Sequence, residues 1–434
     1  MVAFSAAVAH AQYAPGLTPQ EQAKPWSVAA TIRGFYDDNY LTLPKTIPGT
    51  TPGTFVNGAR SSYGIEASPS VAYNHSMADT LISASYVYDM QWYQDREGTV
   101  DQSHQFNARM DHEFTERYKM SVGESFVIAQ EPTVVDTTVI STPLRVAGNN
   151  IHNTATIDGT AVLNKMFDVH AGYANSLYAY QQNAGDESPA RSYPSYSAIL
   201  DRIDQTATVD LRWKVLPETT GVLGYQYEYV NYTSPEYVIY PGKSEFTGAF
   251  VPGYLANARN SESDFVYVGA DQSFSPKLNA SIRLGAQYID YFNDGMTALS
   301  PYADASLTYQ YMPQSSAQVG VKHIRNATDV AGITGTSLVL DEESTSAYVS
   351  VTHKVTSKFT ASMMAQAQFS SFDGGGAIYD GKEENFYILN LDFAYHFTPW
   401  LAGDAGYNYS KLNSDLSDRS YARDVVYIGI RATY

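Results

Sequence analysis

The amino-acid sequence predicts an all-β fold, a closed antiparallel sheet that crosses a membrane as a β-barrel. Three features predict it: long segments in which apolar and polar residues alternate, connections that are alternately short and long, and a low mean hydropathy of -0.28 over 434 residues. No apolar run approaches the roughly 18 residues that a membrane-spanning helix requires. A membrane protein of this hydropathy must cross the bilayer with strands.

The last strand shows the alternation most clearly. Counted back from the end of the chain, one side of the predicted strand carries Tyr434, Ala432, Ile430 and Ile428. The other side carries Thr433, Arg431 and Gly429. Because successive side chains of a strand point to opposite faces, one face can meet lipid and the other water. Such a strand is typical of an outer-membrane barrel.

The same alternation recurs along the chain, over residues 105–114, 206–215, 278–288 and 359–369. Soluble β-sandwiches also alternate, but their strands usually run for only about 5–6 residues. Alternating stretches of roughly 10 residues are what a tilted membrane strand needs. The length of these stretches therefore favours a membrane barrel over a soluble sandwich.

The connections are of two kinds, and they alternate. Short turns such as Phe274–Leu278 and Phe397–Leu401 lie between long polar or Gly/Pro-rich loops such as 182–199 and 373–384. In outer-membrane barrels the short turns are periplasmic and the long loops extracellular. One strand on each side of every connection gives about eighteen strands, with about sixteen as the alternative. Since an open sheet edge cannot survive in lipid, the first strand, near residues 27–36, is expected to pair with the last.

The N-terminus is expected to be an export signal. Residues 1–11 combine an apolar stretch with Ala9-His10-Ala11, which has the small-x-small form of a signal-peptidase site. We interpret residues 1–11 as a signal peptide whose start is truncated, residues 12–25 as a periplasmic lead-in and residues 26–434 as the barrel. The absence of cysteine suits export through an oxidising periplasm.

With these features, residues 26–434 resemble the porin-like outer-membrane β-barrel proteins of Gram-negative bacteria. The most specific residues are terminal: Tyr434 with Ala432, Ile430 and Ile428 looks like the C-terminal signal that the barrel assembly machinery reads, although such proteins usually end in Phe. The resemblance implies a location in the bacterial outer membrane, contact with lipid and lipopolysaccharide, and a general pore. Porins of this size are often homotrimers, so the resemblance leaves a trimer open.

Charged residues on the polar side of the strands are candidates for lining the pore. The basic candidates are Arg33, Arg109, Lys119, Arg212, Lys214, Arg283, Lys322, Lys354 and Arg431. The acidic candidates are Glu66, Asp111, Glu113, Asp158, Asp168, Asp210, Glu228, Asp271, Asp304, Asp392 and Asp404. Because the two signs nearly cancel, we expect a mixed field rather than the one-sign ring that gives ion selectivity directly. For any single residue, a structural salt bridge along the wall is the alternative.

The long loops 37–60 and 234–260 are candidates for narrowing the lumen, and a cover over the outer mouth is the alternative. Another loop, with Asp373, Asp380, Glu383 and Glu384, offers oxygen ligands that Ca²⁺ could use. Its spacing does not match an EF-hand loop. We therefore interpret it as a solvated acidic loop and predict no metal site.

The predicted function is passive diffusion of small hydrophilic solutes through a mixed-charge lumen. The alternative is a structural or interaction barrel with a plugged lumen, whose loops or lead-in bind a partner or a surface polymer. No enzyme and no cofactor are expected, because the sequence has no His-Glu-x-x-His pair, no nucleophile elbow and no phosphate-binding loop. A formal net charge of -18 disfavours binding to nucleic acid.

Overall fold

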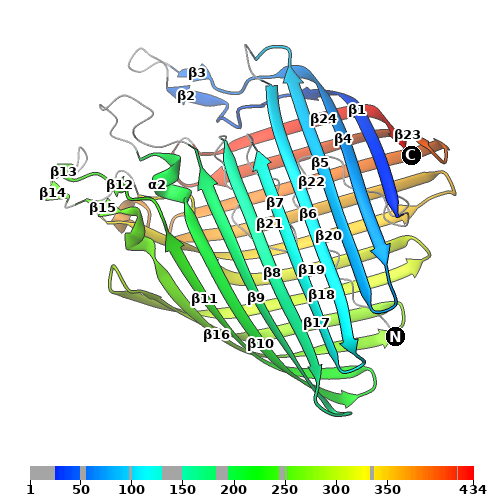
Figure 1. Ribbon diagram of the computed structural model, residues 1–434. Helices are drawn as coiled ribbons and strands as arrows, with labels where there is room; N and C mark the ends of the chain where they lie inside the picture. Colours follow the sequence, from blue (N-terminus) through cyan, green and yellow to red (C-terminus); the bar gives the residue numbers. More distant parts are fainter. Residues whose placement is uncertain are drawn as a thin grey trace.

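The alternating segments form one antiparallel sheet of 18 strands in the computed structural model (Figure 1). The structure describes residues 25–48, 55–96, 100–129, 149–181, 194–243, 250–251, 253–332, 337–417 and 419–434. The strands of the large sheet are β1 (Trp26–Asp37), β4 (Ser62–Ser76), β5 (Thr80–Tyr93), β6 (Val100–Thr115), β7 (Tyr118–Ala129), β8 (Asn150–Val162), β9 (Phe167–Tyr180), β10 (Arg202–Leu216), β11 (Thr219–Tyr232), β16 (Ser261–Ser275), β17 (Leu278–Tyr291), β18 (Met296–Met312), β19 (Ser315–Asn326), β20 (Val339–Lys354), β21 (Phe359–Gly374), β22 (Glu383–Thr398), β23 (Leu401–Ser414) and β24 (Tyr421–Thr433).

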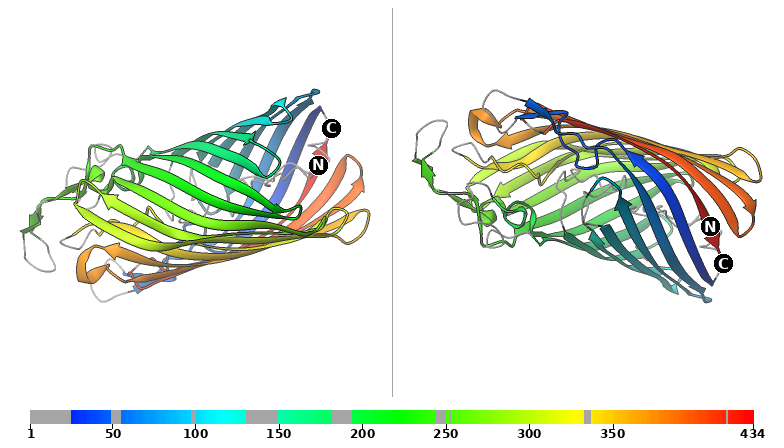
Figure 2. Two further views of the ribbon diagram at one scale, coloured as in Figure 1. Left: turned by 90° about the horizontal axis from the view of Figure 1, so that it is seen from below. Right: turned by 90° about the horizontal axis from the view of Figure 1, so that it is seen from above.

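The sheet closes on itself where the first strand meets the last. β1 pairs with β4 on one side and with β24 on the other, in a register that runs from Ala29 opposite Thr433 to Asp37 opposite Val425. The Tyr434 amide donates to the Val28 carbonyl at 2.8 Å and ends this ladder at the short-turn rim. No edge is therefore left at the seam (Figures 1 and 2). The predicted closed barrel and its strand number are confirmed.

The strands carry two different faces because their side chains alternate. They are 12 to 17 residues long, which exceeds the roughly 9–11 residues that a tilted strand needs to cross a bilayer. In β1, Val28 and Ile32 are 53% and 56% exposed, whereas Ser27 and Thr31 are buried. A continuous belt of such exposed apolar side chains is unfavourable in water and suits lipid. The alternate residues, which are polar or charged in most strands, face the interior.

A repeated hydroxyl motif forms several of the short turns. In one turn the Thr356 hydroxyl accepts hydrogen bonds from the amides of Lys358 and Phe359, at 3.2 and 3.0 Å. Ser275 and Thr115 make the equivalent bonds in the turns that follow β16 and β6. Because the side chain satisfies amides that the ladder leaves open, a Ser or Thr at this position favours a tight reversal.

Small elements extend the long loops at the opposite rim. They are β2 (Thr46–Pro48), β3 (Phe55–Asn57), α2 (Tyr196–Leu200), β12 (Tyr237–Ile239), β13 (Gly242–Lys243), β14 (Phe250–Val251), β15 (Tyr254–Leu255), η2 (Ala256–Arg259) and η3 (Gly376–Ile378). β13 and β14 extend away from the barrel (Figure 2). In the described part of the chain, no helix has the length and apolarity needed to cross a bilayer. The predicted signal peptide and nearly all of the lead-in fall on residues 1–24, outside the described residues.

Candidate functional site

The candidate site is the inner wall of the barrel together with the loops at its long-loop mouth. The two-residue period places the charged residues predicted to line the lumen on the side of each strand opposite to its exposed apolar side chains. Arg212, for example, alternates with Leu211 and Trp213, which are 40% and 46% exposed. These charged residues do not gather at one point but form several separate groups along the wall.

One group lies across the closure seam. The Arg33 guanidinium on β1 pairs with Asp404 on β23 and with Glu66 on β4, the latter at 3.2 Å. It also lies 4.3 Å from the centre of the Tyr427 ring on β24, whose hydroxyl donates to Asp392 at 2.8 Å. Four predicted wall residues on four strands are thus connected around one guanidinium. Arg431 lies on the same face of β24, two residues beyond Gly429, which pairs with Arg33.

A second group lies on β9, β10, β16 and β17. Arg212 donates to Asp271 at 2.8 Å and lies 3.7 Å from Asp168, which also pairs with Lys214 at 3.2 Å. Arg283 reaches the same Asp271 at 2.9 Å. Basic and acidic side chains therefore alternate around this part of the wall, and each carboxylate contacts two cations.

The remaining predicted residues occupy the same face in smaller contacts. Hydrogen bonds or ion pairs join Arg109 to Asp111, Glu113 to Lys119, Asp158 to His170, Asp210 to Tyr267 and Lys354 to Gln314. Asp304 and Lys322 lie directly opposite each other on β18 and β19. Glu228 lies on β11 between Thr206 and Ser263 of the neighbouring strands. Across the described wall, then, most charges have a partner of the other sign or a hydrogen-bonding neighbour.

At the mouth, loop residues pack against the inner faces of the strand ends. Ala198 and Leu200 of α2, Val238 of β12 and Ala256 of η2 are fully buried in one apolar cluster. The same cluster contains Tyr180, Ile199, Val230, Tyr232, Ile239, Ile289, Tyr291, Ala331, Leu338 and Leu340. The period of β11 and β17 places their members of this set on the inner face. Described residues of the loops after β9, β11 and β19 are therefore packed into the opening. We call these residues the mouth cluster.

The loop that follows β19 is held from two sides. On one side, Arg259 of η2 donates to the Thr328 carbonyl at 3.2 Å and to the Ile199 carbonyl. On the other, Arg419 pairs with Asp329 at 2.7 Å and with Glu384 of β22. Residues 328–331 are at most 5% exposed. We call residues 327–332 the strap, because they connect groups from the β11–β16 and β23–β24 loops.

Burial sets the electrostatics of these loop groups. Arg259 lies 4.1 Å from the centre of the Tyr232 ring, and burial lowers the pKa of its guanidinium. Burial also acts against the charge of Arg419, but Asp329 and Glu384 outweigh it and raise the pKa of Arg419. At the end of α2, burial raises the pKa of Asp201, against hydrogen bonds from Ser197 and from the Tyr180 amide.

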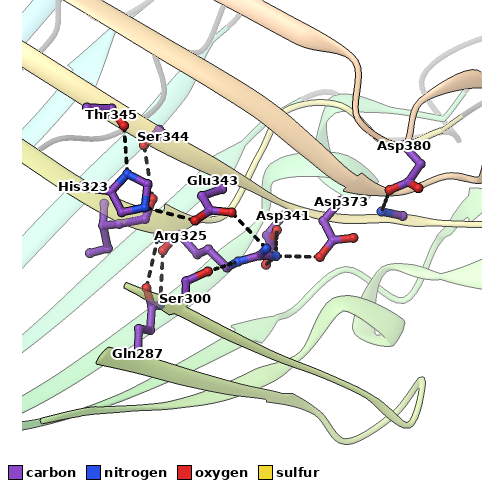
Figure 3. A network of polar contacts seen from close by, with 12 residues as sticks. Gln287, Ser300, His323, Arg325, Asp341, Glu343, Ser344, Thr345, Asp373 and Asp380 are labelled. Atoms are coloured by element: carbon purple, nitrogen blue, oxygen red, sulfur yellow. Dashed lines mark hydrogen bonds and ion pairs between the residues drawn. The ribbon is translucent and has the colours of Figure 1, made fainter. Parts of the chain in front are cut away.

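A further network fixes the start of β20 beside the tip of β19 (Figure 3). Arg325 contacts Asp341 at 3.1 Å, Glu343 at 3.1 Å and Asp373 at 2.6 Å, so one guanidinium joins β19, β20 and β21. His323 lies 3.0 Å from the other oxygen of Glu343. This network holds both ends of the loop that contains the strap.

The constriction prediction named loops 37–60 and 234–260 and did not include the strap. Of the two predicted loops, 234–260 contributes Val238, Ile239 and Ala256 to the mouth cluster, while the described residues of loop 37–60 (37–48 and 55–60) are not part of it. Sequence reasoning misses the strap, because charged residues, threonines and glycines make the segment 329–343 resemble an ordinary polar loop. A signal was present: Val330-Ala331 and Leu338-Val339-Leu340 are apolar residues within that loop.

Two acidic residues beside the loop after β21 form ion pairs with arginines. Asp373 pairs with Arg325 and Glu384 with Arg419. The described residues contain no group of three or more His, Asp or Glu that could hold a metal ion. Gly374, Gly375 and Gly376 all have positive φ, between 63° and 86°, so the glycine run serves the backbone of this reversal.

Comparison with known proteins gives a family match and several structural matches. Residues 249–434, less than half of the chain, match the family model described as "Putative beta-barrel porin 2". OpdK from Pseudomonas aeruginosa, solved with vanillate, is similar with a TM-score of 0.45 and 8% identity, over 94% of this chain and 99% of that one. OccAB4 from Acinetobacter baumannii gives a TM-score of 0.40 and 12% identity, over 96% and 100%. No curated protein sequence matches the chain.

The predicted resemblance to porin-like barrels is confirmed by the family match. The location in the bacterial outer membrane is confirmed with it.

Proposed function

We propose that this porin-like outer-membrane barrel is a channel for passive diffusion of small hydrophilic solutes, and that the mouth cluster and the strap narrow its entrance. The observation that carries the proposal is the closed ring of 18 strands with a charged inner wall and an apolar outer belt. A polar inner face needs water or polar groups beside it, and water in a membrane barrel is a path for solutes.

The size of the ring supports a water-filled interior. Eighteen strands about 4.8 Å apart and tilted by roughly 40° enclose a cylinder with a radius on the order of 18 Å. Side chains on the wall cannot fill a cylinder of that radius. Water or loops must therefore occupy the interior, and in the mouth cluster loop residues pack against the inner face of the strand ends.

The chemistry of the wall supports solutes that are polar but carry no net charge. The groups around Arg33 and around Arg212 contain both signs. A wall of paired charges offers hydrogen-bonding groups to passing solutes, whereas a ring of one sign would exclude ions of that sign. Neutral and zwitterionic solutes fit this wall best.

The burial of the strap favours a second candidate. Thr328 and Ala331 are only 1% and 2% exposed, so the mouth is tightly packed at this point. A barrel plugged there would be a structural or interaction protein whose loops, such as the projecting β13–β14 hairpin, bind a partner or a surface polymer.

Planar-bilayer recording of the purified barrel separates these candidates. A channel is expected to show discrete openings whose conductance rises with KCl concentration. Insertion without any openings, verified by the presence of folded protein in the bilayer, would rule out the channel and leave the plugged barrel. Liposome swelling in an uncharged sugar provides the same comparison for neutral solutes.

We also propose that the C-terminal residues form the assembly signal. Ile428, Ile430 and Tyr434 are 70%, 54% and 90% exposed on the outer face of β24, with Ala432 between them, so another protein can read them before the barrel closes. Contact with lipopolysaccharide, a homotrimer, cleavage after residue 11 and the absence of catalysis remain proposals that follow from the porin-like fold.

A further inference from the structure

Midway along β20 and β21, three polar side chains of the inner wall contain buried atoms that make no hydrogen bond. Ser346 lies opposite Gln368, and Gln366 is two residues further along β21 on the same face. Ser346 and Gln368 are each 1% exposed and Gln366 is 5% exposed. The Ser346 hydroxyl, both amide atoms of Gln366 and the amide oxygen of Gln368 make no hydrogen bond.

These unpaired atoms are costly. A buried polar atom without a partner loses on the order of 1–3 kcal/mol relative to water, and buried polar groups in proteins are nearly always paired. The amide nitrogen of Gln368, in contrast, is paired: it donates to Glu342 at 3.2 Å and to Ser370 at 3.1 Å. These two hydrogen bonds fix the orientation of the Gln368 amide and leave its oxygen without a hydrogen-bond donor.

An apolar strip lies beside these atoms. Phe386 and Ile388 of β22 pair in register with Gln368 and Gln366. They form a cluster with Leu412 of β23, and all three are buried on the inner face. A solute that rests here meets amide and hydroxyl groups on one side and an aromatic and aliphatic surface on the other.

We infer that Ser346, Gln366 and Gln368, with the strip of Phe386 and Ile388, form a binding subsite for a neutral polyhydroxylated solute such as a sugar. Each hydroxyl of a sugar both donates and accepts, which matches a set that contains two amide oxygens, one amide nitrogen and one hydroxyl. The C–H face of a sugar ring suits an aromatic side chain. This inference rests on the proposed channel for its access route.

Charged solutes fit the subsite less well. An anion would face the oxygens of Gln366 and Gln368 and the nearby Glu342 carboxylate. A cation would face the Gln366 amide nitrogen and Lys322, which lies opposite Ser346 on β19. A neutral solute avoids both conflicts. It must move aside the side chains that shield these atoms, and the new hydrogen bonds offset that cost.

The test compares maltose binding to the detergent-purified barrel and to two variants by titration calorimetry. Gln366→Leu keeps the size of the side chain and removes both unpaired atoms, so maltose affinity is expected to fall about tenfold. Ser346→Ala removes one atom and should cause a smaller loss. Gln226→Leu is the matched control: it makes the same change on the inner face of β11 and should leave affinity unchanged. Heat-modifiable migration in gels verifies that each variant is folded.

The outcomes separate this inference from the channel proposal. Maltose should also block KCl currents in bilayers, and the block should weaken in Gln366→Leu. A triethylene glycol dimethyl ether probe, which accepts but cannot donate hydrogen bonds, should bind poorly.

Openings without any maltose binding would overturn the subsite and leave the channel intact. Binding that Gln366→Leu abolishes, in a barrel that never opens, would support the subsite and refute the channel. Equal losses in Gln366→Leu and Gln226→Leu would also overturn the subsite.

Discussion

At the seam, one guanidinium stands between two carboxylates from other strands. Arg33 and its partners Glu66 and Asp404 have side chains that are only 9–12% exposed. Glycine makes room for this arrangement, because a Cβ at Gly429 would lie 2.5 Å from the Arg33 side chain. A buried pair of charges adds little by itself, but removing one partner leaves a desolvated charge. Residue identity is therefore critical here.

Replacing Arg33 should destabilise the barrel markedly. Arg33→Met leaves both carboxylates unpaired, and we expect a loss of about 3–5 kcal/mol, measured by urea unfolding in detergent or lipid. Lys119→Met is the control, since the Lys119 and Glu113 side chains are 43% and 51% exposed and exposed pairs contribute about 0–1 kcal/mol. Equal effects of the two substitutions would contradict the assignment of Arg33 as a buried anchor.

Asp201 should make the mouth sensitive to pH. Burial raises its pKa above the usual 3.8 in the folded state, so the folded protein binds this proton more tightly than the unfolded chain. Stability from this group is then present at low pH and is lost as the pH rises through the raised pKa. The stability of Asp201→Asn relative to the parent should therefore increase as the pH rises from about 4 to 7. Thermal unfolding of both proteins at several pH values measures this difference. A constant difference across this range would refute the shift.

Among the elements, the strands could be predicted from the sequence and the packed loops could not. A strand with lipid on one side and water on the other must alternate, so the pattern of 278–288 or 359–369 indicates both its structure and its inward face. The strap has no such period. Its conformation depends on Arg259 and Arg419, which lie far from it in the sequence and contact it in the folded barrel. The subsite at Gln366 was equally hidden, because its signal is a missing partner.

Releasing one end of the strap should widen the mouth. Arg419→Met removes the ion pair between Arg419 and Asp329, and we expect noisier openings with a mean conductance increased on the order of twofold. The measurement is single-channel recording at constant KCl. Arg96→Met is the matched control, because Arg96 forms an ion pair with Asp101 beside the β5–β6 loop of the same rim and has no contact with the strap. An unchanged conductance in Arg419→Met would show that the strap does not limit flow.

For the molecule as a whole, closure is the property on which the other features depend. Lipid offers no hydrogen bonds, so a sheet in the membrane is stable only if its first and last strands meet. That requirement made the pairing of β1 with β24 predictable across the entire chain. Closure also creates the inner face of the wall. On that face, charged residues from strands distant in the sequence become neighbours, as Arg33 and Asp404 do.

The seam can be tested directly because the chain contains no cysteine. Ala30 and Ala432 lie opposite each other on the outer face of β1 and β24, and directly opposed residues of antiparallel strands have Cα atoms about 4.5–5.5 Å apart, within the range of a disulfide. The double variant Ala30→Cys/Ala432→Cys should form an intramolecular disulfide on mild oxidation and migrate differently on non-reducing gels after heat denaturation. Ala30→Cys/Ala347→Cys, with the second site on β20, should not, because β20 pairs only with β19 and β21. A folded first variant that stays reduced, or forms only dimers, would mean that the ring is open at β1.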